Sequence, residues 1–163
     1  MKKFYNLGKK KLFPICRSLT GFGVRKTLKI IKKEFSNLKI KNVKSGLKVF
    51  DWTVPPEWNV INAYVIDKNG FKIIDFKKNN LHLVGYSTPI KQTLKKKDLF
   101  KNFHFLKKQP QAIPYITSYY KKRWGFCITY DEFKKFDKKY VSEDEFKVVI
   151  DSSFKKDGNL NYG

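Results

Sequence analysis

Hydrophobic positions near the N-terminus recur with the period of an α-helix. Residues 4–16 carry loosely spaced apolar side chains, which predict a first helix. Two glycines and two residues able to cap a helix follow at 17–23, and a second helix is then expected over 23–34. One continuous face of this second helix is apolar: Val24, Leu28, Ile31 and Phe35. We interpret the basic positions off that face as a solvated surface in preference to a binding stripe: Arg25, Lys26, Lys29, Lys32 and Lys33.

From residue 38 onward the pattern changes to that of β-strands. Strands are predicted at 38–43, 63–67, 71–76, 81–86, 124–129 and 146–152, and residues 116–120 are expected to be extended. The pair Asn69-Gly70 favours a hairpin between two of them, because both residues tolerate the positive φ of a tight turn. Helical spacing returns at 93–106 and, after a cap at Asp131, at 132–136.

The C-terminal residues predict a turn at 156–159 and then the start of a return strand at 160–163. Either this strand is a frayed edge or it belongs to an element that continues, because strands usually have about five or six residues. Together the elements predict an α+β fold, with an N-terminal helical pair followed by a β-rich domain.

The charge of the chain is high for a folded domain. Among 163 residues, 36 are Lys or Arg and 14 are Asp or Glu, a net charge of +22, which at first suggests nucleic acid or another polyanion as partner. Only Arg17, Arg25 and Arg123 are arginine, however, whereas readers of nucleic acid depend on arginine for bidentate contacts. We therefore interpret the excess of lysine as compositional drift, and nucleic acid remains the weaker partner hypothesis.

The N-terminal residues are not expected to act as a secretory signal, and no membrane-spanning segment is expected. The apolar run Leu12–Cys16 is shorter than the roughly 7–15 residues of a secretory signal, and no segment approaches the roughly 20 of a spanning helix. A cytoplasmic protein without a membrane span is predicted. The two cysteines, Cys16 and Cys127, are interpreted as isolated buried thiols.

Candidate chemistry is sparse. His82 and His104 are the two imidazoles, and they lack the close spacing of zinc ligands, so no metal site and no catalytic residue are predicted within the chain. Gly21 and Gly23 open a helix and offer either an anion site or an ordinary turn, the latter favoured. Asp51 and Glu57 flank two tryptophans, where a carboxyl either acts as a general acid of raised pKa or caps backbone N–H groups, the latter again favoured.

The most unusual stretch is 117–127, which joins hydroxyl, aromatic and basic side chains. Such interleaving is typical of a platform for single-stranded nucleic acid, and equally of a β-domain around a polar pocket. The sequence leaves both alternatives open.

Several of these segments, taken in order, resemble a known family. The matching segments are 15–21, 23–25, 49–55, 57–59, 75–76, 80–82, 85–87, 113–115, 117–120, 123–127 and 150–153. They are similar to the N-terminal portion of bacterial aminopeptidase-like proteins of polysaccharide biosynthesis, of the DUF4910/DUF2172 type, which are relatives of the M28 zinc peptidases. The match extends over nearly the whole chain.

The resemblance implies an M28-like α/β parent fold with an inserted β-domain. On that basis residues 1–36 are helices of the aminopeptidase-like core, 37–155 the β-rich inserted domain, and 156–163 the start of a return to the core. The first metal-ligand motif of the family would follow this point. The chain is therefore expected to be a truncated member that holds no zinc and does not hydrolyse peptides alone, zinc being implied only for the complete fold. A separately encoded C-terminal catalytic half is the partner this implies.

If the parent fold forms, the expected pocket residues are Tyr120, Arg123 and Trp124, with His82 next. Arg123 would bind a substrate carboxylate through a bidentate fork. The alternative, held slightly ahead, is that Trp124 belongs to the core and that Arg123 pairs with a loop carbonyl. The runner-up function is a basic binding module for nucleic acid or an anionic polysaccharide.

Overall fold

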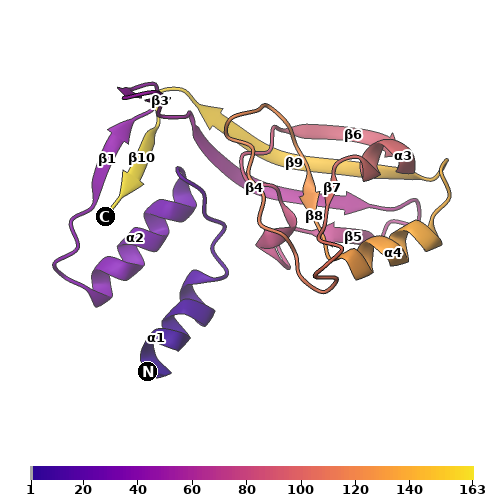
Figure 1. Cartoon of the computed structure of the whole chain (residues 1–163), viewed down its shortest axis with the longest axis horizontal. Coiled ribbons are helices and arrows are strands. Elements are labelled where there is room, and N and C mark those ends of the chain that lie inside the picture. Colours follow the sequence, from indigo (N-terminus) through magenta and orange to yellow (C-terminus); the bar gives the residue numbers. More distant parts are fainter. Residues whose placement is uncertain (1) are drawn as a thin grey trace. The chain divides into compact units, whose positions relative to one another are not determined.

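The structure is a computed structural model that describes residues 2–163 (Figure 1). The chain folds into two compact units. The first, here the N-terminal unit, comprises Met1–Asn59 and Ser153–Gly163, and the second, here the sheet unit, comprises Val60–Ser152. Strands β4 (Glu57–Ile66) and β9 (Glu145–Lys155) contribute residues to both. The domain limits implied by the family resemblance concern a complete parent protein and stay a prediction.

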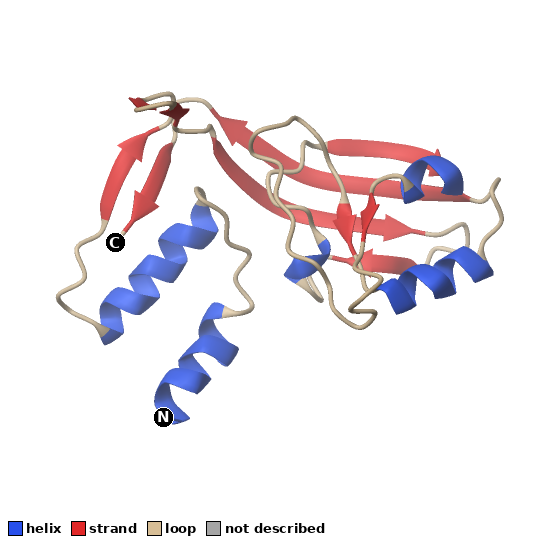
Figure 2. Cartoon of the chain, viewed as in Figure 1, coloured by secondary structure: helices blue, strands red, loops and turns tan. Residues whose placement is uncertain are grey.

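The N-terminal unit holds three helical segments and short strands (Figure 2). Its helices are α1 (Lys2–Asn6), the π-helical η1 (Leu7–Leu12) and α2 (Phe22–Glu34). Its strands form two antiparallel pairs, β1 (Lys41–Lys44) with β10 (Asn159–Tyr162) and β2 (Lys48–Val49) with β3 (Trp52–Thr53). The last residues of the chain are thus a paired strand, in register from Lys41↔Tyr162 to Lys44↔Asn159.

The sheet unit is built on a four-stranded sheet of order β5-β4-β9-β6. The hairpin predicted at Asn69-Gly70 is confirmed: β4 pairs antiparallel with β5 (Lys72–Asp75), and Gly70 has φ +84°. Asp67 closes the turn, since its Oδ1 accepts hydrogen bonds from the backbone N–H of Asn69 and of Phe71. The buried Asp67 also accepts a hydrogen bond from the hydroxyl of Tyr140 at 2.8 Å.

The other elements of the sheet unit lie between β5 and β9 in the sequence. They are η2 (Asn80–His82, a 3-10 turn), β6 (Ile90–Lys95), α3 (Lys96–Phe100), β7 (Phe103–His104), β8 (Phe126–Cys127) and α4 (Tyr130–Lys139). Along β9 the side chains of Phe146, Val148 and Ile150 are buried at alternate positions, as a strand with one face on a core requires.

Several predicted elements are wrong in extent or type. Residues 93–106, predicted as one helix, instead form β6, α3 and β7, because β6 pairs in register with β9 from Ile90↔Ile150 to Lys95↔Glu145. The helix predicted over 4–16 ends at Leu12 and consists of α1 followed directly by the π-helical η1, and the strand predicted over 81–86 is a 3-10 turn and an irregular loop. Helix α4 is longer than expected, and Thr129, not Asp131, caps it through a capping box with Glu132. The α+β fold class and the helix at 23–34 are confirmed.

Among the described residues, no helix is long and apolar enough to cross a membrane. The cytoplasmic location stays a prediction.

Candidate functional site

In the N-terminal unit, the best-defined polar cluster surrounds Glu57. Arg25 donates two hydrogen bonds to its carboxylate, from Nη1 to Oε2 at 2.8 Å and from Nη2 to Oε1 at 2.7 Å. Asn59 Nδ2 donates to Oε1 and the backbone N–H of Asn159 to Oε2, each at 3.1 Å. The hydrogen bonds from Arg25, aided by those from Asn59 and Asn159, outweigh the opposing effect of burial and lower the pKa of Glu57 to about 2. We call this group the Arg25–Glu57 clasp.

The clasp bears on two alternatives that the sequence left open. The pKa of Glu57 is lowered, the opposite of the raised pKa expected of a general acid, and its carboxylate accepts the backbone N–H of Asn159, not one of its own proline-rich segment. Arg25 forms a bidentate ion pair with Glu57, whose side chain is only 6% exposed. The interpretation of Arg25 as freely solvated surface is therefore wrong.

Glycines allow the backbone segments around the clasp to approach closely. A Cβ on Gly21, whose φ is +94°, would lie 2.1 Å from the carbonyl oxygen of Trp58, and one on Gly158 would lie 2.2 Å from Cβ of Glu57. Thr20 Oγ1 accepts from the backbone N–H of Trp58 at 2.9 Å. Asn59 Oδ1 accepts from the N–H of Phe22 at 2.7 Å, so the first N–H of α2 is already paired, which favours the ordinary-turn alternative for this glycine pair.

The sheet unit holds the second candidate site, a pocket of about 290 Å³. Its lining residues are Thr117, Ser118, Tyr119, Tyr120, Lys121 and Arg123. Arg123 donates from Nη2 to the carbonyl oxygen of Thr117 at 3.1 Å. Tyr120 is 76% exposed, and its ring meets that of Tyr119 edge to face, with centroids 4.5 Å apart.

The pocket loop is fixed by hydrogen bonds to the segment 84–88. Gly85 N–H donates to the carbonyl oxygen of Ile116 and Ser118 N–H donates to that of Gly85, both at 2.8 Å. Ser118 Oγ donates to the carbonyl oxygen of Tyr86 at 3.0 Å. Tyr86 is 2% exposed and has φ +61°, the left-handed region that a bulky side chain rarely adopts. Backbone strain of this kind persists only where the surrounding contacts enforce it.

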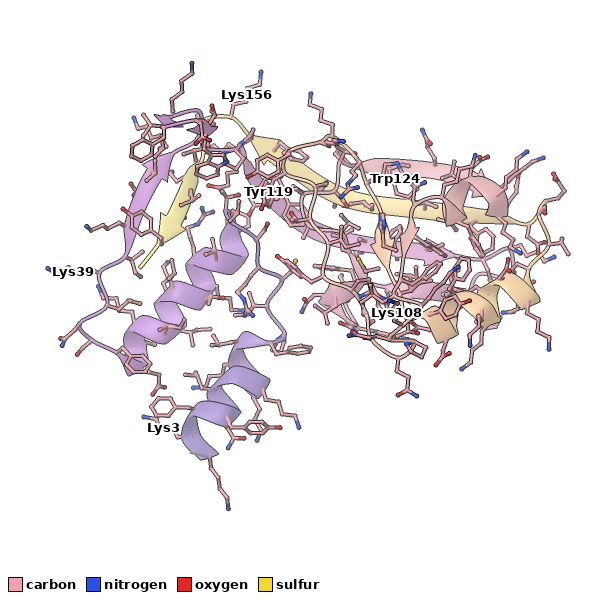
Figure 3. The ribbon with its side chains drawn as sticks, in the orientation of Figure 1. Lys3, Lys39, Lys108, Tyr119, Trp124 and Lys156 are labelled. Carbon is pink, nitrogen blue, oxygen red and sulfur yellow. The ribbon has the colours of Figure 1, made fainter. Side chains whose placement is uncertain are left out.

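The four pocket residues expected from the sequence do not all meet at this pocket. Tyr120 and Arg123 line it, whereas Trp124 and His82 are not among the lining residues. Trp124 is half-buried and its ring meets that of Phe126 edge to face, while His82 Nδ1 is 2.9 Å from the carbonyl oxygen of Cys127. Trp124 is labelled in Figure 3, as is Tyr119 of the pocket. The roles of the four predicted residues toward a substrate stay a prediction.

Sequence reasoning missed four lining residues, Thr117, Ser118, Tyr119 and Lys121, as members of the pocket. The signal was present, because all four belong to the stretch 117–127 already marked by its aromatic and basic content. What the sequence did not show was the anchor at Gly85 and Tyr86, which lies more than 30 residues earlier in the chain.

Metal-binding residues do not gather in the part of the chain that the structure describes. No group of three or more His, Cys, Asp or Glu side chains is placed to hold an ion in residues 2–163. Both cysteines are free: Cys127 is buried and Cys16 only half-buried, and burial raises their thiol pKa values to about 12 and about 11. At neutral pH these thiols stay protonated, which disfavours them as nucleophiles or metal ligands.

Comparisons with known proteins agree with the resemblance. Residues 57–153 match the family model DUF2172, a domain of unknown function. A Clostridium acetobutylicum protein, described as a candidate polysaccharide biosynthesis protein with an aminopeptidase-like domain, is 52% identical over 161 residues. A crystal structure of a candidate peptidase from the same organism matches with a TM-score of 0.89 at 50% identity.

These matches cover a much larger share of this chain than of the relatives. Each includes 99% of this chain, but the chain spans only 35% of the polysaccharide biosynthesis relative and 36% of the crystallised peptidase. The family model covers more than half of the chain and all of the sheet unit. The chain therefore belongs to the DUF2172 family and corresponds to the N-terminal third of an aminopeptidase-like protein of polysaccharide biosynthesis.

Proposed function

We propose that this chain is the non-catalytic N-terminal region of an aminopeptidase-like protein, and that the zinc ligands for hydrolysis come from further polypeptide. The observation that carries the proposal is the 52% identity over 161 residues to a relative of which the chain spans 35%. The described residues do not fit a zinc site, so we assign them no step in hydrolysis.

The surface of the N-terminal unit supports a role within a larger assembly. Among the described residues of this unit, twelve large hydrophobic side chains are exposed, including Phe4, Phe22 and Phe35 at 55%, 69% and 50%. Exposed apolar area of this extent commonly marks a surface that another polypeptide covers. We propose that the catalytic part of the aminopeptidase-like protein, either on the same polypeptide or encoded separately, is that partner.

A complementation experiment tests the proposal. This chain, the C-terminal two-thirds of the Clostridium relative, and a mixture or fusion of the two are each assayed with aminoacyl-coumarin amides, with and without zinc. We expect no cleavage by this chain, and metal-dependent cleavage once the two parts are combined. The C-terminal part alone is the matched control. Cleavage by this chain alone, or a combination that is no more active than the control, would contradict the proposal.

A second candidate function, binding to an anionic polymer, rests on a groove of about 430 Å³ along α2. The groove is lined by Phe22, Arg25, Lys26, Lys29, Ile30 and Lys33. The three lysines are not committed to the clasp and could contact phosphates or carboxylates, with Phe22 beside them. Such binding weakens steeply as salt rises, because it releases counterions.

Two triple variants with equal loss of charge separate this candidate from non-specific charge effects. Binding of a labelled oligonucleotide or polyuronate is measured from 50 to about 200 mM salt, for the wild type and for Lys26→Ala/Lys29→Ala/Lys33→Ala. Lys107→Ala/Lys108→Ala/Lys135→Ala is the control with equal charge loss. If both triple variants lose the same affinity, the groove has no specific role.

A further inference from the structure

The pocket lined by Tyr120 and Arg123 lies in a stretch of chain without any acidic residue. Between Asp98 and Asp131 there is no Asp or Glu, but there are six basic residues: Lys101, Lys107, Lys108, Lys121, Lys122 and Arg123. The pocket itself includes two of them, Lys121 and Arg123. A ligand with a free ammonium group would find no carboxylate here, whereas an anionic ligand would find two cations.

Arg123 retains most of its hydrogen-bonding capacity. Its single hydrogen bond among the described residues, to the carbonyl oxygen of Thr117, fixes the direction of the guanidinium group. The salt bridges of the sheet unit, which involve Asp67, Asp75, Asp98, Asp131, Asp137, Glu143 and Asp144, do not include it. Its remaining N–H groups are suited to a planar carboxylate, which they can bind with two parallel hydrogen bonds.

The tyrosines supply the other half of the recognition surface. Tyr120 is 76% exposed, so its ring is open to a flat apolar partner, and the edge-to-face contacts of Tyr119 with Tyr120 and with the buried Tyr86 hold the aromatic pair in place. The hydrogen bonds of Ser118 to Gly85 and Tyr86 order this loop before any ligand arrives, which lowers the entropic cost of binding.

We propose that this pocket binds an acidic sugar residue, with Arg123 and Lys121 on its carboxylate and Tyr120 against its pyranose ring. The choice of a saccharide over other anions rests on the proposed function, a region of a protein of polysaccharide biosynthesis. The pocket is then a recognition site for the glycan.

Binding to this chain alone tests the proposal without reference to catalysis. Calorimetry is carried out with a uronic-acid oligosaccharide, the corresponding neutral oligosaccharide and inorganic phosphate. We expect saturable binding of the uronic-acid ligand, and at least tenfold weaker binding of the other two. Equal binding of phosphate would reduce the site to a general anion site, and absence of uronic-acid binding at about 10 mM would overturn the proposal. A failure of complementation with an intact uronic-acid site would overturn only the proposed function.

Three variants assign the binding to named residues. Arg123→Ala should weaken uronic-acid binding about 10- to 100-fold, the value of hydrogen bonds to a charged group, and Arg123→Lys should recover only part of it. Tyr120→Ala should weaken the uronic-acid and neutral ligands alike, because it removes ring stacking and no charge. Lys108→Ala is the matched control: it removes one exposed positive charge from the same unit, at a position well separated from Tyr119 in Figure 3. If it weakens binding as much as Arg123→Ala does, net charge and not the pocket accounts for the affinity.

Discussion

The two units of this chain bury their hydrophobic side chains to very different extents. Among the described residues, the sheet unit has fifteen buried hydrophobic side chains and six exposed large ones. The N-terminal unit has only three buried, Leu7, Val54 and Trp58, and twelve exposed. The N-terminal unit is also the more basic, with 17 basic and 4 acidic residues against 19 and 10. The sheet unit thus has a core of its own, whereas the N-terminal unit does not.

The N-terminal unit is held instead by close backbone contacts and a polar cluster. Arg25, Glu57, Asn59 and Asn159 form the clasp, and glycines at Gly21 and Gly158 let the segments meet. Hydrogen bonds and ion pairs fix geometry well, but their net contribution to stability is about 1 kcal/mol each, less than that of a buried aromatic ring. These contacts are consistent with the proposal that a further polypeptide covers the N-terminal unit.

The largest effect should come from the core of the sheet unit. Phe146 is fully buried, lies opposite Leu94 and meets the ring of Tyr140 edge to face at 4.9 Å. Phe146→Ala should lower the free energy of unfolding by about 3–5 kcal/mol, through lost burial and the cavity that remains.

Urea unfolding monitored by amide hydrogen exchange measures this loss and shows which amides are affected. Phe50→Ala is the matched control, because Phe50 is 100% exposed and its loss should change stability little. If the two substitutions cost the same, the burial contrast between the units has no energetic meaning.

The next largest effect concerns the backbone contact at Gly21. Gly21→Ala combines a φ of +94° with a Cβ 2.1 Å from the carbonyl oxygen of Trp58, so the segment must shift and the clasp must open. We expect a loss of about 2–3 kcal/mol, seen as faster amide exchange in α2 and at Trp58.

Gly46→Ala separates conformational strain from steric conflict. Gly46 has a similar φ of +86°, but a Cβ there would have no neighbour within 4 Å. Its substitution should therefore cost only the strain of a left-handed residue, about 1 kcal/mol. A Gly21→Ala variant that is no less stable than Gly46→Ala would show that the close approach to Trp58 contributes nothing.

The clasp should make the N-terminal unit sensitive to acid. The pKa of Glu57 in the folded chain is about 2, below its usual 4.5, so its contribution to stability is complete above about pH 4.5 and is lost as pH falls toward 2.

Glu57→Gln isolates this contribution from those of other carboxyls. Asp67 and Asp144 also have lowered pKa values, so the useful quantity is the difference in unfolding free energy between wild type and variant from pH 7 to pH 2. The difference should shrink as pH falls, because a protonated Glu57 carboxyl and the neutral amide of the variant hold Arg25 about equally weakly. A constant difference would show that the ion pair is not the source.

The sequence predicted the elements that local physics determines. The helix at 23–34 has a continuous apolar face, and the hairpin at Asn69-Gly70 has a turn that few other residues allow. The prediction of one helix over 93–106 was wrong. The apolar residues there fit a helical period, but the pairing of Ile90–Lys95 with β9 determines the structure. Pairing with a strand 50 to 60 residues away is not visible in a local pattern.

The candidate site shows the same limit. Tyr120 and Arg123 were predictable from an unusual mixture of aromatic and basic residues, and they do line one pocket. The distant anchor at Gly85 and Tyr86 was not predictable, because it depends on a long-range contact. The ion pair of Arg25 with Glu57 was not predictable either, because 32 positions separate the two residues. The sequence placed Arg25 on a helix surface and Glu57 beside two tryptophans.

The smallest predicted effect is a titration shift that reports on the charge of Arg123. Burial, and secondarily the charge of Arg123, hold the pKa of His104 below its usual value of 6.5. Arg123→Ala should therefore raise the pKa of His104, but not fully to the usual value, because burial remains; Arg123→Lys should leave it nearly unchanged. Proton NMR of the two imidazoles measures the shift, and His82→Gln assigns the signals. A carboxylate bound to Arg123 would offset the same charge and raise the His104 pKa in the wild type, whereas in Arg123→Ala the same ligand should have no such effect. An unchanged His104 pKa in Arg123→Ala would mean that solvent screens this charge, and the pocket would then have to bind its ligand through contact geometry alone.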